Sequence, residues 1–256
     1  MLYAAVSAAA ISGRSMPDIT SEGVVMGERL AAECGGRAIS VYDDIFRAVG
    51  AEHGDDWRVI GAIAYHESRF EAEIVSRRGA VGLMQLMPVV CRHFDVDEDT
   101  ILEPFTNVRL AARLLSEIER SLRIPQGIPD EERMGIVLAG YNSGVGHVSD
   151  ARRLARAEGE NPDSWRVVAR YLELKSQPEY YKRPEVRSGR FINGRQTIAY
   201  VADVMSKYRQ YCRLIPDDAG IEVAEEILQL PDYSPAAAGD ENRRSTSLFH
   251  SPPAES

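Results

Sequence analysis

Residues 63–70 read IAYHESRF, and this stretch places a carboxylate on a helix face that is otherwise apolar. In a helix, positions i, i+3, i+4 and i+7 share one face. Glu67 lies four residues after Ile63 and seven after Ile60, so it shares a face with those residues and with Ala64. Such a face packs into a protein core, and a carboxylate there needs either a structural partner or a chemical task.

Two interpretations of Glu67 follow from the residues alone. In the first, Glu67 is a structural residue that forms an ion pair with Arg58 or Arg69. In the second, desolvation favours the protonated carboxyl group, which then acts as a general acid. Enzymes that cleave glycosidic bonds use a carboxyl group in this way. The segments that follow Glu67 favour the second interpretation.

Helical patterns dominate the chain from residue 41 onward. Apolar residues recur at helical spacing, and Pro88 suits the first turn of a further helix. We expect about seven helices, in segments 41–54, 55–67, 88 onward, 107–122, 129–142, 163–174 and 197–212. Strand patterns are nearly absent, apart from a short hairpin expected around residues 75–86. The predicted fold class is therefore mainly α, with at most a short β-hairpin.

The composition is that of an ordinary globular protein. Hydrophobic residues make up 44% and charged residues 27% of the 256 residues, and no apolar run is long enough for a membrane-spanning helix. The net charge is −9, but residues 216–256 hold nine acidic residues and two arginines and so carry −7 of it. The rest of the chain is nearly neutral, which argues against nucleic acid as a partner.

The three cysteines support neither a zinc site nor a disulfide framework. Cys34, Cys91 and Cys212 are odd in number and show no CxxC spacing. A single disulfide with one remaining thiol is compatible with an exported protein. We expect no metal and no cofactor.

Composition divides the chain into three parts. Residues 1–40 are rich in Ala, Gly and Ser, and we interpret them as the remnant of a signal peptide or as a linker. The first basic residue is Arg14, so the basic start of a signal peptide is missing. Residues 41–214 form the predicted domain. Residues 215–256, which are acidic and contain several prolines, are predicted to be a disordered tail.

Four short motifs occur in an order that resembles one enzyme family. They are Glu67-Ser68, Gly82-Leu83-Met84-Gln85, Tyr141-Asn142 and Tyr200-Val201. In this order they resemble the lysozyme-like lytic transglycosylases of bacterial cell-wall turnover. Residues 150–181 look specifically like the catalytic module of membrane-bound lytic transglycosylase F. The likeness covers about residues 41–213, roughly two thirds of the chain.

Three departures from the family pattern stand out. Gly140 occupies a position where relatives usually have Ala, which we expect to be silent. Gln196 lies four residues before Tyr200, where relatives commonly carry Glu, so one substrate contact is in doubt. Transglycosylase F proteins usually carry a solute-binding-like domain ahead of the catalytic one. Only about 40 residues precede the predicted domain in this sequence, so we expect the solute-binding-like domain to be missing.

The resemblance implies a goose-type lysozyme-like helical fold and a set of site residues. Glu67 would be the single catalytic acid and base. Six further residues would line the glycan groove: Ser68, Met84, Gln85, Tyr141, Asn142 and Tyr200. Core packing is the alternative role for Met84 and the two tyrosines. We expect His66 at the surface or rim of the site, and His147 as a cap after the preceding helix.

The resemblance also implies a reaction. The expected enzyme is a peptidoglycan lytic transglycosylase that cleaves the β-1,4 bond between N-acetylmuramic acid and N-acetylglucosamine and leaves 1,6-anhydro-muramic acid ends. Residues 74–94 contain no Asp or Glu, so no second carboxylate is evident across the groove. Peptidoglycan glycan strands are the expected partner, and the cell envelope, periplasmic or outer-membrane-associated, is the expected location. The alternatives are a hydrolytic muramidase and a weakly active peptidoglycan-binding protein.

Overall fold

The computed structural model describes residues 38–216, and these residues are mainly helical. The helices are α2 (Asp43–His53), α3 (Trp57–Ser68), α4 (Pro88–His93), the 3₁₀ helix η2 (Glu98–Thr100), α5 (Pro104–Leu122), α6 (Asp130–Ser143), α7 (Val145–Ala157), α8 (Trp165–Leu174), α9 (Pro178–Tyr181) and α10 (Gly194–Leu214). The expected hairpin is reduced to two isolated antiparallel bridges, Val75 with Val81 and Val81 with Leu86. The prediction of a mainly α fold with at most a short hairpin is confirmed.

The ends of the described region extend slightly beyond the expected domain. Ile39 and Ser40 are buried at its start, and Ile215 is buried at its end. The carbonyl of Ile215 accepts a hydrogen bond from Arg58 Nη1 at 3.0 Å. Residues 1–37 and 217–256, with Cys34, lie outside the described residues, as do most of the expected N-terminal segment and acidic tail.

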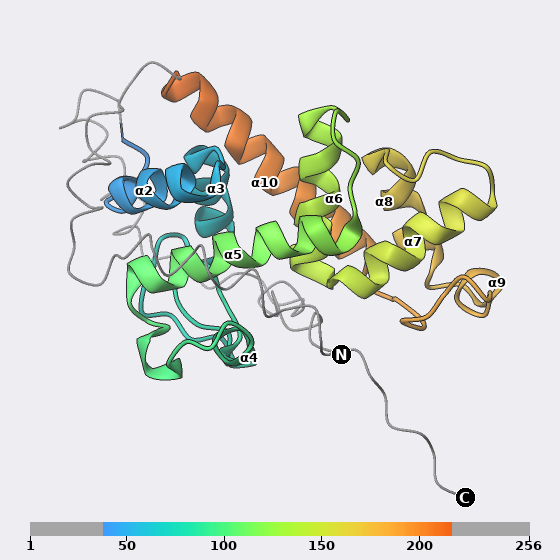
Figure 1. The fold of residues 1–256 in the computed structure, drawn as a ribbon, viewed down its shortest axis with the longest axis horizontal. Helices are drawn as coiled ribbons and strands as arrows, with labels where there is room; N and C mark the ends of the chain where they lie inside the picture. The colour runs from blue at the N-terminus through green and yellow to red at the C-terminus, as the bar shows by residue number, and fades with distance from the viewer. Residues whose placement is uncertain (1–37, 217–256) are drawn as a thin grey trace, which may run out of the picture.

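Two long helices hold the others together. α10 runs diagonally across the molecule and packs against α3, α6 and α8, while α5 packs against α2, α6 and α7 (Figure 1). α6 lies between them, and residues 135–141 within it are all buried. A helix that is buried on all sides belongs at the centre of a helical domain. Among residues 38–216, no helix combines the length and the apolar character needed to cross a membrane.

α3 has clear signals at both of its ends. The side chain of Asp56 accepts a hydrogen bond from the backbone N–H of Arg58 at 2.9 Å, which caps the first turn. At the other end, Arg69 and Phe70 both have positive φ, 55° and 68°. Two successive residues in the left-handed region turn the chain sharply away. The helix therefore ends directly after Glu67 and Ser68.

α7 is a separate helix, and it changes the interpretation of His147. Gly144, with φ 90°, ends α6 and starts α7. His147 lies inside α7, where its ring stacks on Phe191 with a centroid distance of 4.3 Å. The expectation that His147 caps the preceding helix is therefore wrong, because the backbone turn at Gly144 restarts the helix before it.

A buried ion pair joins α7 to the segment after α8. Asp150 and Lys175 are both 0% exposed, and Lys175 Nζ donates to Asp150 Oδ2 at 2.6 Å. Asp150 also accepts the backbone N–H groups of Arg187 and Ser188, both at 2.9 Å, and pairs with Arg153. Burial opposes the charge on Asp150, but these hydrogen bonds outweigh it and lower the pKa of its carboxyl group.

Lys175 has fewer partners than Asp150. Besides Asp150, its ammonium group contacts His147 Nδ1 at 3.0 Å. Burial and the charge of Lys175 lower the pKa of His147 to about 4, so His147 is neutral at pH 7 and accepts that hydrogen bond. Burial lowers the pKa of Lys175 itself in spite of the adjacent carboxylate. The ammonium group thus depends on Asp150 for its charge compensation.

We predict that Asp150→Asn lowers the free energy of unfolding by about 3 kcal/mol, because it leaves the buried Lys175 charge uncompensated. Lys175→Met should cost less, since Asp150 keeps Arg153 and two backbone donors. Urea denaturation at pH 7 measures both. The folded-state pKa of Asp150 is lowered, so its contribution is present above the unfolded-state pKa and lost as the pH falls through the folded-state value. Equal losses in the two variants would contradict this ranking.

Candidate active site

Glu67 lies in the last turn of α3 and is 6% exposed. The two arginines that could have formed a structural ion pair have partners of their own. Arg58 binds Asp56 and the Ile215 carbonyl near the opposite end of α3. The Arg69 guanidinium donates to the Tyr65 carbonyl at 2.8 Å and lies over the Tyr65 ring. The carboxyl group of Glu67 is thus held in a largely buried position at a helix end.

Two buried phenols lie within the electrostatic reach of Glu67. Tyr141 of α6 is 0% exposed and Tyr200 of α10 is 2% exposed. Burial raises the pKa of Tyr141 well above its usual range, and the charge of Glu67 adds to the effect. Burial likewise raises the pKa of Tyr200, followed by the charge of Glu67. The fold therefore brings three sequence-predicted residues, from three different helices, to one place.

The hydroxyl groups of the two tyrosines differ in their contacts. Tyr141 Oη donates to the carbonyl of Met84 at 2.8 Å. Tyr200 Oη is shielded from solvent and lies next to the Glu67 side chain, whose charge and hydrogen bond both act to raise the pKa of Tyr200. The Tyr141 hydroxyl therefore binds the turn at Met84, while the Tyr200 hydroxyl lies beside Glu67.

Met84 and Gln85 lie in a tight turn, and both are buried. Val81 and Leu86 exchange backbone hydrogen bonds of 2.8 and 3.0 Å, and Gln85 adopts φ 47° between them. The Gln85 side-chain amide donates to the carbonyls of Gly82 and Ile74 at 3.1 and 3.3 Å. Met84 is 0% and Gln85 1% exposed. In this structure both side chains are buried beneath the turn and support its conformation.

Asn107 at the start of α5 holds this turn, and the sequence reasoning missed it. Its side-chain oxygen accepts the N–H of Met84 at 2.8 Å, and its amide donates to the carbonyls of Val81 at 3.0 Å and Ile101 at 2.8 Å. A Cβ at Gly82 would lie 2.6 Å from the Asn107 amide nitrogen, so this contact requires glycine. The sequence contained a signal that Asn107 is buried. Asn107 lies on the same buried face of α5 as Ala111, just as Glu67 lies on the buried face of α3.

The other predicted residues have the following positions. Ser68 is 4% exposed, and its hydroxyl donates to the Ala64 carbonyl within α3 at 3.1 Å. Asn142 follows Tyr141, and its side-chain oxygen accepts a hydrogen bond from Thr197 Oγ1 at 2.8 Å, which links α6 to α10. Gln196 is exposed in the first turn of α10. Ser68 and Asn142 thus have structural hydrogen bonds of their own.

His66 lies beside the phenols rather than in free solvent. Its ring packs edge-on against Tyr200 with a centroid distance of 4.6 Å, and its side chain is 20% exposed. Burial lowers the pKa of His66, and Arg69 adds to the effect, while Asp203 opposes it. His66 is therefore a neutral ring that supports Tyr200 at neutral pH.

Within residues 38–216, no group of three or more His, Cys, Asp or Glu side chains is placed to bind a metal ion. Cys91 and Cys212, the two cysteines in that region, are both free.

Comparison with known proteins places this arrangement in context. Residues 44–164 match the model of the family described as Transglycosylase SLT domain. The range contains Glu67, the Met84 turn, Asn107 and Tyr141, while Tyr200 lies beyond it. The resemblance inferred from the ordered motifs is confirmed.

Two of the similar curated proteins are both named membrane-bound lytic murein transglycosylase F. The chain is 35% identical over 170 residues to membrane-bound lytic murein transglycosylase F of Alcanivorax borkumensis, covering 66% of this chain and 35% of the relative. It is 34% identical over 178 residues to the protein of that name from Marinobacter nauticus, covering 70% and 34%. The chain thus spans about a third of the length of these curated relatives. A solved structure of an inactive mutant of lytic transglycosylase Slt from Pseudomonas aeruginosa matches with a TM-score of 0.47 and 22% identity over 68% of this chain and 24% of that one.

We predict that Asn107→Ala lowers the free energy of unfolding by about 2–4 kcal/mol, because it leaves the buried Met84 N–H and two carbonyls without their partner. Asn161→Ala is the matched control, since the exposed Asn161 side chain only accepts the N–H of Asp163. It should cost about 1 kcal/mol or less. Urea unfolding curves compare the two variants, and similar midpoints would contradict a special role for Asn107.

Proposed function

We propose that this protein is a peptidoglycan lytic transglycosylase that cleaves the β-1,4 bond between N-acetylmuramic acid and N-acetylglucosamine. The observation that carries the proposal is the position of Glu67. It is a buried carboxyl group beside two phenols, and it lies within the segment that matches the Transglycosylase SLT domain family. The relatives named membrane-bound lytic murein transglycosylase F support the same reaction.

Glu67 is suited to the first step because its surroundings favour the protonated carboxyl group. The side chain is 6% exposed, and it lies at the C-terminal end of α3, where the helix dipole disfavours negative charge. In the proposed mechanism Glu67 donates its proton to the glycosidic oxygen, and the bond from that oxygen to C1 of the muramic acid breaks. N-acetylglucosamine leaves with a free hydroxyl group, and Glu67 becomes a carboxylate.

The second step uses the same residue as a base. The N-acetyl group of the muramic acid stabilises the positive charge that develops at C1. The Glu67 carboxylate then removes the proton from the C6 hydroxyl group of the same sugar, and the C6 oxygen bonds to C1. This closes the 1,6-anhydro ring and returns Glu67 to its protonated form, so no water molecule is consumed.

The distribution of carboxylates supports a reaction without activated water. Glycosidases that hydrolyse usually place a second carboxylate across the sugar. Residues 74–94 contain no acid, and Glu71 and Glu73, which precede them, are both exposed. Asp203 lies next to His66 on α10, with its side chain 71% exposed. None of these acids is buried opposite Glu67.

The other site residues are proposed to act in two ways. Met84, Gln85 and Tyr141 are almost completely buried, and we assign them to shaping the groove wall next to Glu67. Tyr200, whose hydroxyl lies beside the Glu67 side chain, is proposed to hold a substrate hydroxyl near the carboxyl group. Ser68 and Asn142 are proposed as further substrate contacts. Glycan strands would be the partner and the cell envelope the location, in keeping with the relatives' names.

We predict that Glu67→Gln lowers the rate of murein cleavage by at least about 100-fold, because glutamine keeps the shape but cannot transfer the proton. Circular dichroism and binding to murein sacculi should be unchanged. Glu71→Gln, one helical turn later in sequence and exposed, is the control and should keep its activity. If Glu67→Gln retained more than a small fraction of the activity, Glu67 would not be the acid.

We predict that digested sacculi carry 1,6-anhydro-muramic acid ends, because residues 74–94, where a second carboxylate is expected, contain none to activate water. Mass spectrometry distinguishes them from reducing ends, which weigh one water molecule more. Mostly reducing ends would contradict the mechanism and favour a hydrolytic muramidase. Bound sacculi with no released fragments would favour a peptidoglycan-binding protein of little activity.

A further inference from the structure

A second hollow lies at the other end of α3. It has a volume of about 300 Å³ and is formed by the start of α3, the middle of α5, α6 and the second half of α10. Asp56 at its edge precedes Glu67 by eleven residues, which corresponds to about 16 Å along a helix. The hollow is therefore separate from the site at Glu67.

The lining of this hollow combines apolar side chains, here called its floor, with charged side chains, here called its rim. Six apolar side chains form the floor: Val59, Ile60, Leu115, Met134, Val137 and Leu138. Four carboxylates and one guanidinium group lie around it: Asp55, Asp56, Glu119, Asp130 and Arg133. When all five are ionised, their net charge is −3. A ligand that satisfies both surfaces needs a positive charge and an apolar part.

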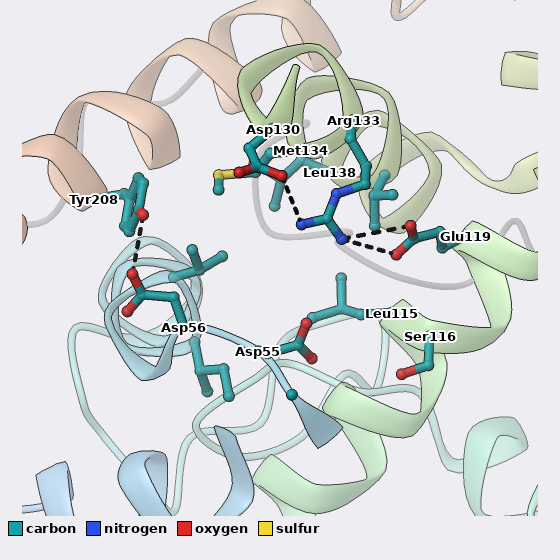
Figure 2. A pocket seen from close by; sticks show the side chains of 14 residues that line it. Asp55, Asp56, Leu115, Ser116, Glu119, Asp130, Arg133, Met134, Leu138 and Tyr208 are labelled. Carbon is teal, nitrogen blue, oxygen red and sulfur yellow. Dashed lines mark hydrogen bonds and ion pairs between the residues drawn. The ribbon is translucent and has the colours of Figure 1, made fainter. Parts of the chain in front are cut away.

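Most of the rim charges already have partners. Arg133 pairs with Glu119 and Asp130, at 3.3 and 3.2 Å. Asp56 binds Arg58 at 2.6 Å and accepts the Tyr208 hydroxyl at 3.0 Å. Figure 2 shows these groups on opposite sides of the hollow, with Asp55 between them.

Asp55 is the exception among the rim carboxylates. Its Oδ2 atom is shielded from solvent and has no hydrogen-bond partner in the described chain. Burial raises the pKa of Asp55, and Glu119 and Asp56 act in the same direction, against Arg133. A shielded carboxylate oxygen without a donor is costly, and a positive charge held close to the Asp55 carboxyl group would reduce that cost.

We propose that this hollow is a second binding site, for a primary ammonium group on a short aliphatic stem, such as the side chain of lysine or of another diamino acid. The ammonium group lies beside the carboxyl group of Asp55, which lines the hollow together with three further carboxylates. The stem covers the apolar floor next to Leu115 and Met134. This inference does not depend on the proposed transglycosylase reaction.

Two small probes test the proposal on the full-length protein. n-Pentylamine carries the charge and the stem, whereas n-pentanol carries the stem alone. Pentylamine should shift the amide NMR signals of Gly54, Val59 and Ser116 and bind about tenfold more tightly than pentanol, since a hydrogen bond to a charged group is worth about a factor of ten. Equal binding of the two probes, or shifts confined to other parts of the protein, would overturn the proposal.

Matched variants locate the charge that the probe recognises. Asp55→Asn should reduce the affinity for pentylamine about tenfold and leave that for pentanol unchanged. Asp99→Asn, an exposed aspartate that does not line the hollow, should change neither affinity. Ser116→Leu should fill part of the hollow and weaken both probes. An unchanged pentylamine affinity in Asp55→Asn would show that the site is not as proposed. If that variant does not fold, the comparison of the two probes and the weaker binding expected in Ser116→Leu test the proposal instead.

Discussion

The backbone of Met84 is held from two sides by side chains of the helical core. Asn107 of α5 accepts its N–H, and Tyr141 of α6 donates to its carbonyl. A buried peptide group without a partner costs free energy, and a tight turn has few partners within itself. The turn can therefore lie against α5 and α6 only because each of these helices supplies it with a polar side chain. Tyr141 also lies close enough to Glu67 for the charge of Glu67 to raise the pKa of Tyr141. The hydrogen bond from Tyr141 to Met84 therefore connects the turn to the site.

The proposed role of Glu67 depends on its position in the fold. Its carboxyl group is 6% exposed and lies at the C-terminal end of a helix, where burial and the helix dipole both disfavour negative charge. The buried phenols of Tyr141 and Tyr200 lie near it, and the ring of His66 packs against that of Tyr200. In the proposed mechanism this environment lets one residue serve in turn as acid and as base. In that mechanism, the N-acetyl group and the C6 hydroxyl group of the substrate take the place of a second carboxylate.

α3 connects two different polar environments. At its start, Asp56 caps the helix and binds Arg58, and Asp55 faces the hollow lined by α5, α6 and α10. At its end, Glu67 meets Tyr141 and Tyr200. The middle of the helix is apolar and buried, so the two ends share a rigid element but no polar groups.

The sequence by itself determined the helical class, most of the helices and the unusual position of Glu67. Periodicity is a local property. A carboxylate on an apolar helix face can therefore be recognised from the sequence without knowing which other segments pack against that face. The sequence also held the signal for Asn107, on the buried stripe of α5, although its partners lie more than twenty residues away at Val81 and Met84.

Tertiary structure decided the rest, because it depends on contacts between distant segments. The partnership of Asp150 with Lys175 spans 25 residues, and that of Tyr141 with Met84 spans 57. His147 was misassigned since the backbone turn at Gly144, which restarts the helix, is not encoded in apolar spacing. The hollow at Asp55 needs four helices to form its wall. Local patterns specify which face of each helix is buried, but only packing specifies which polar groups then meet.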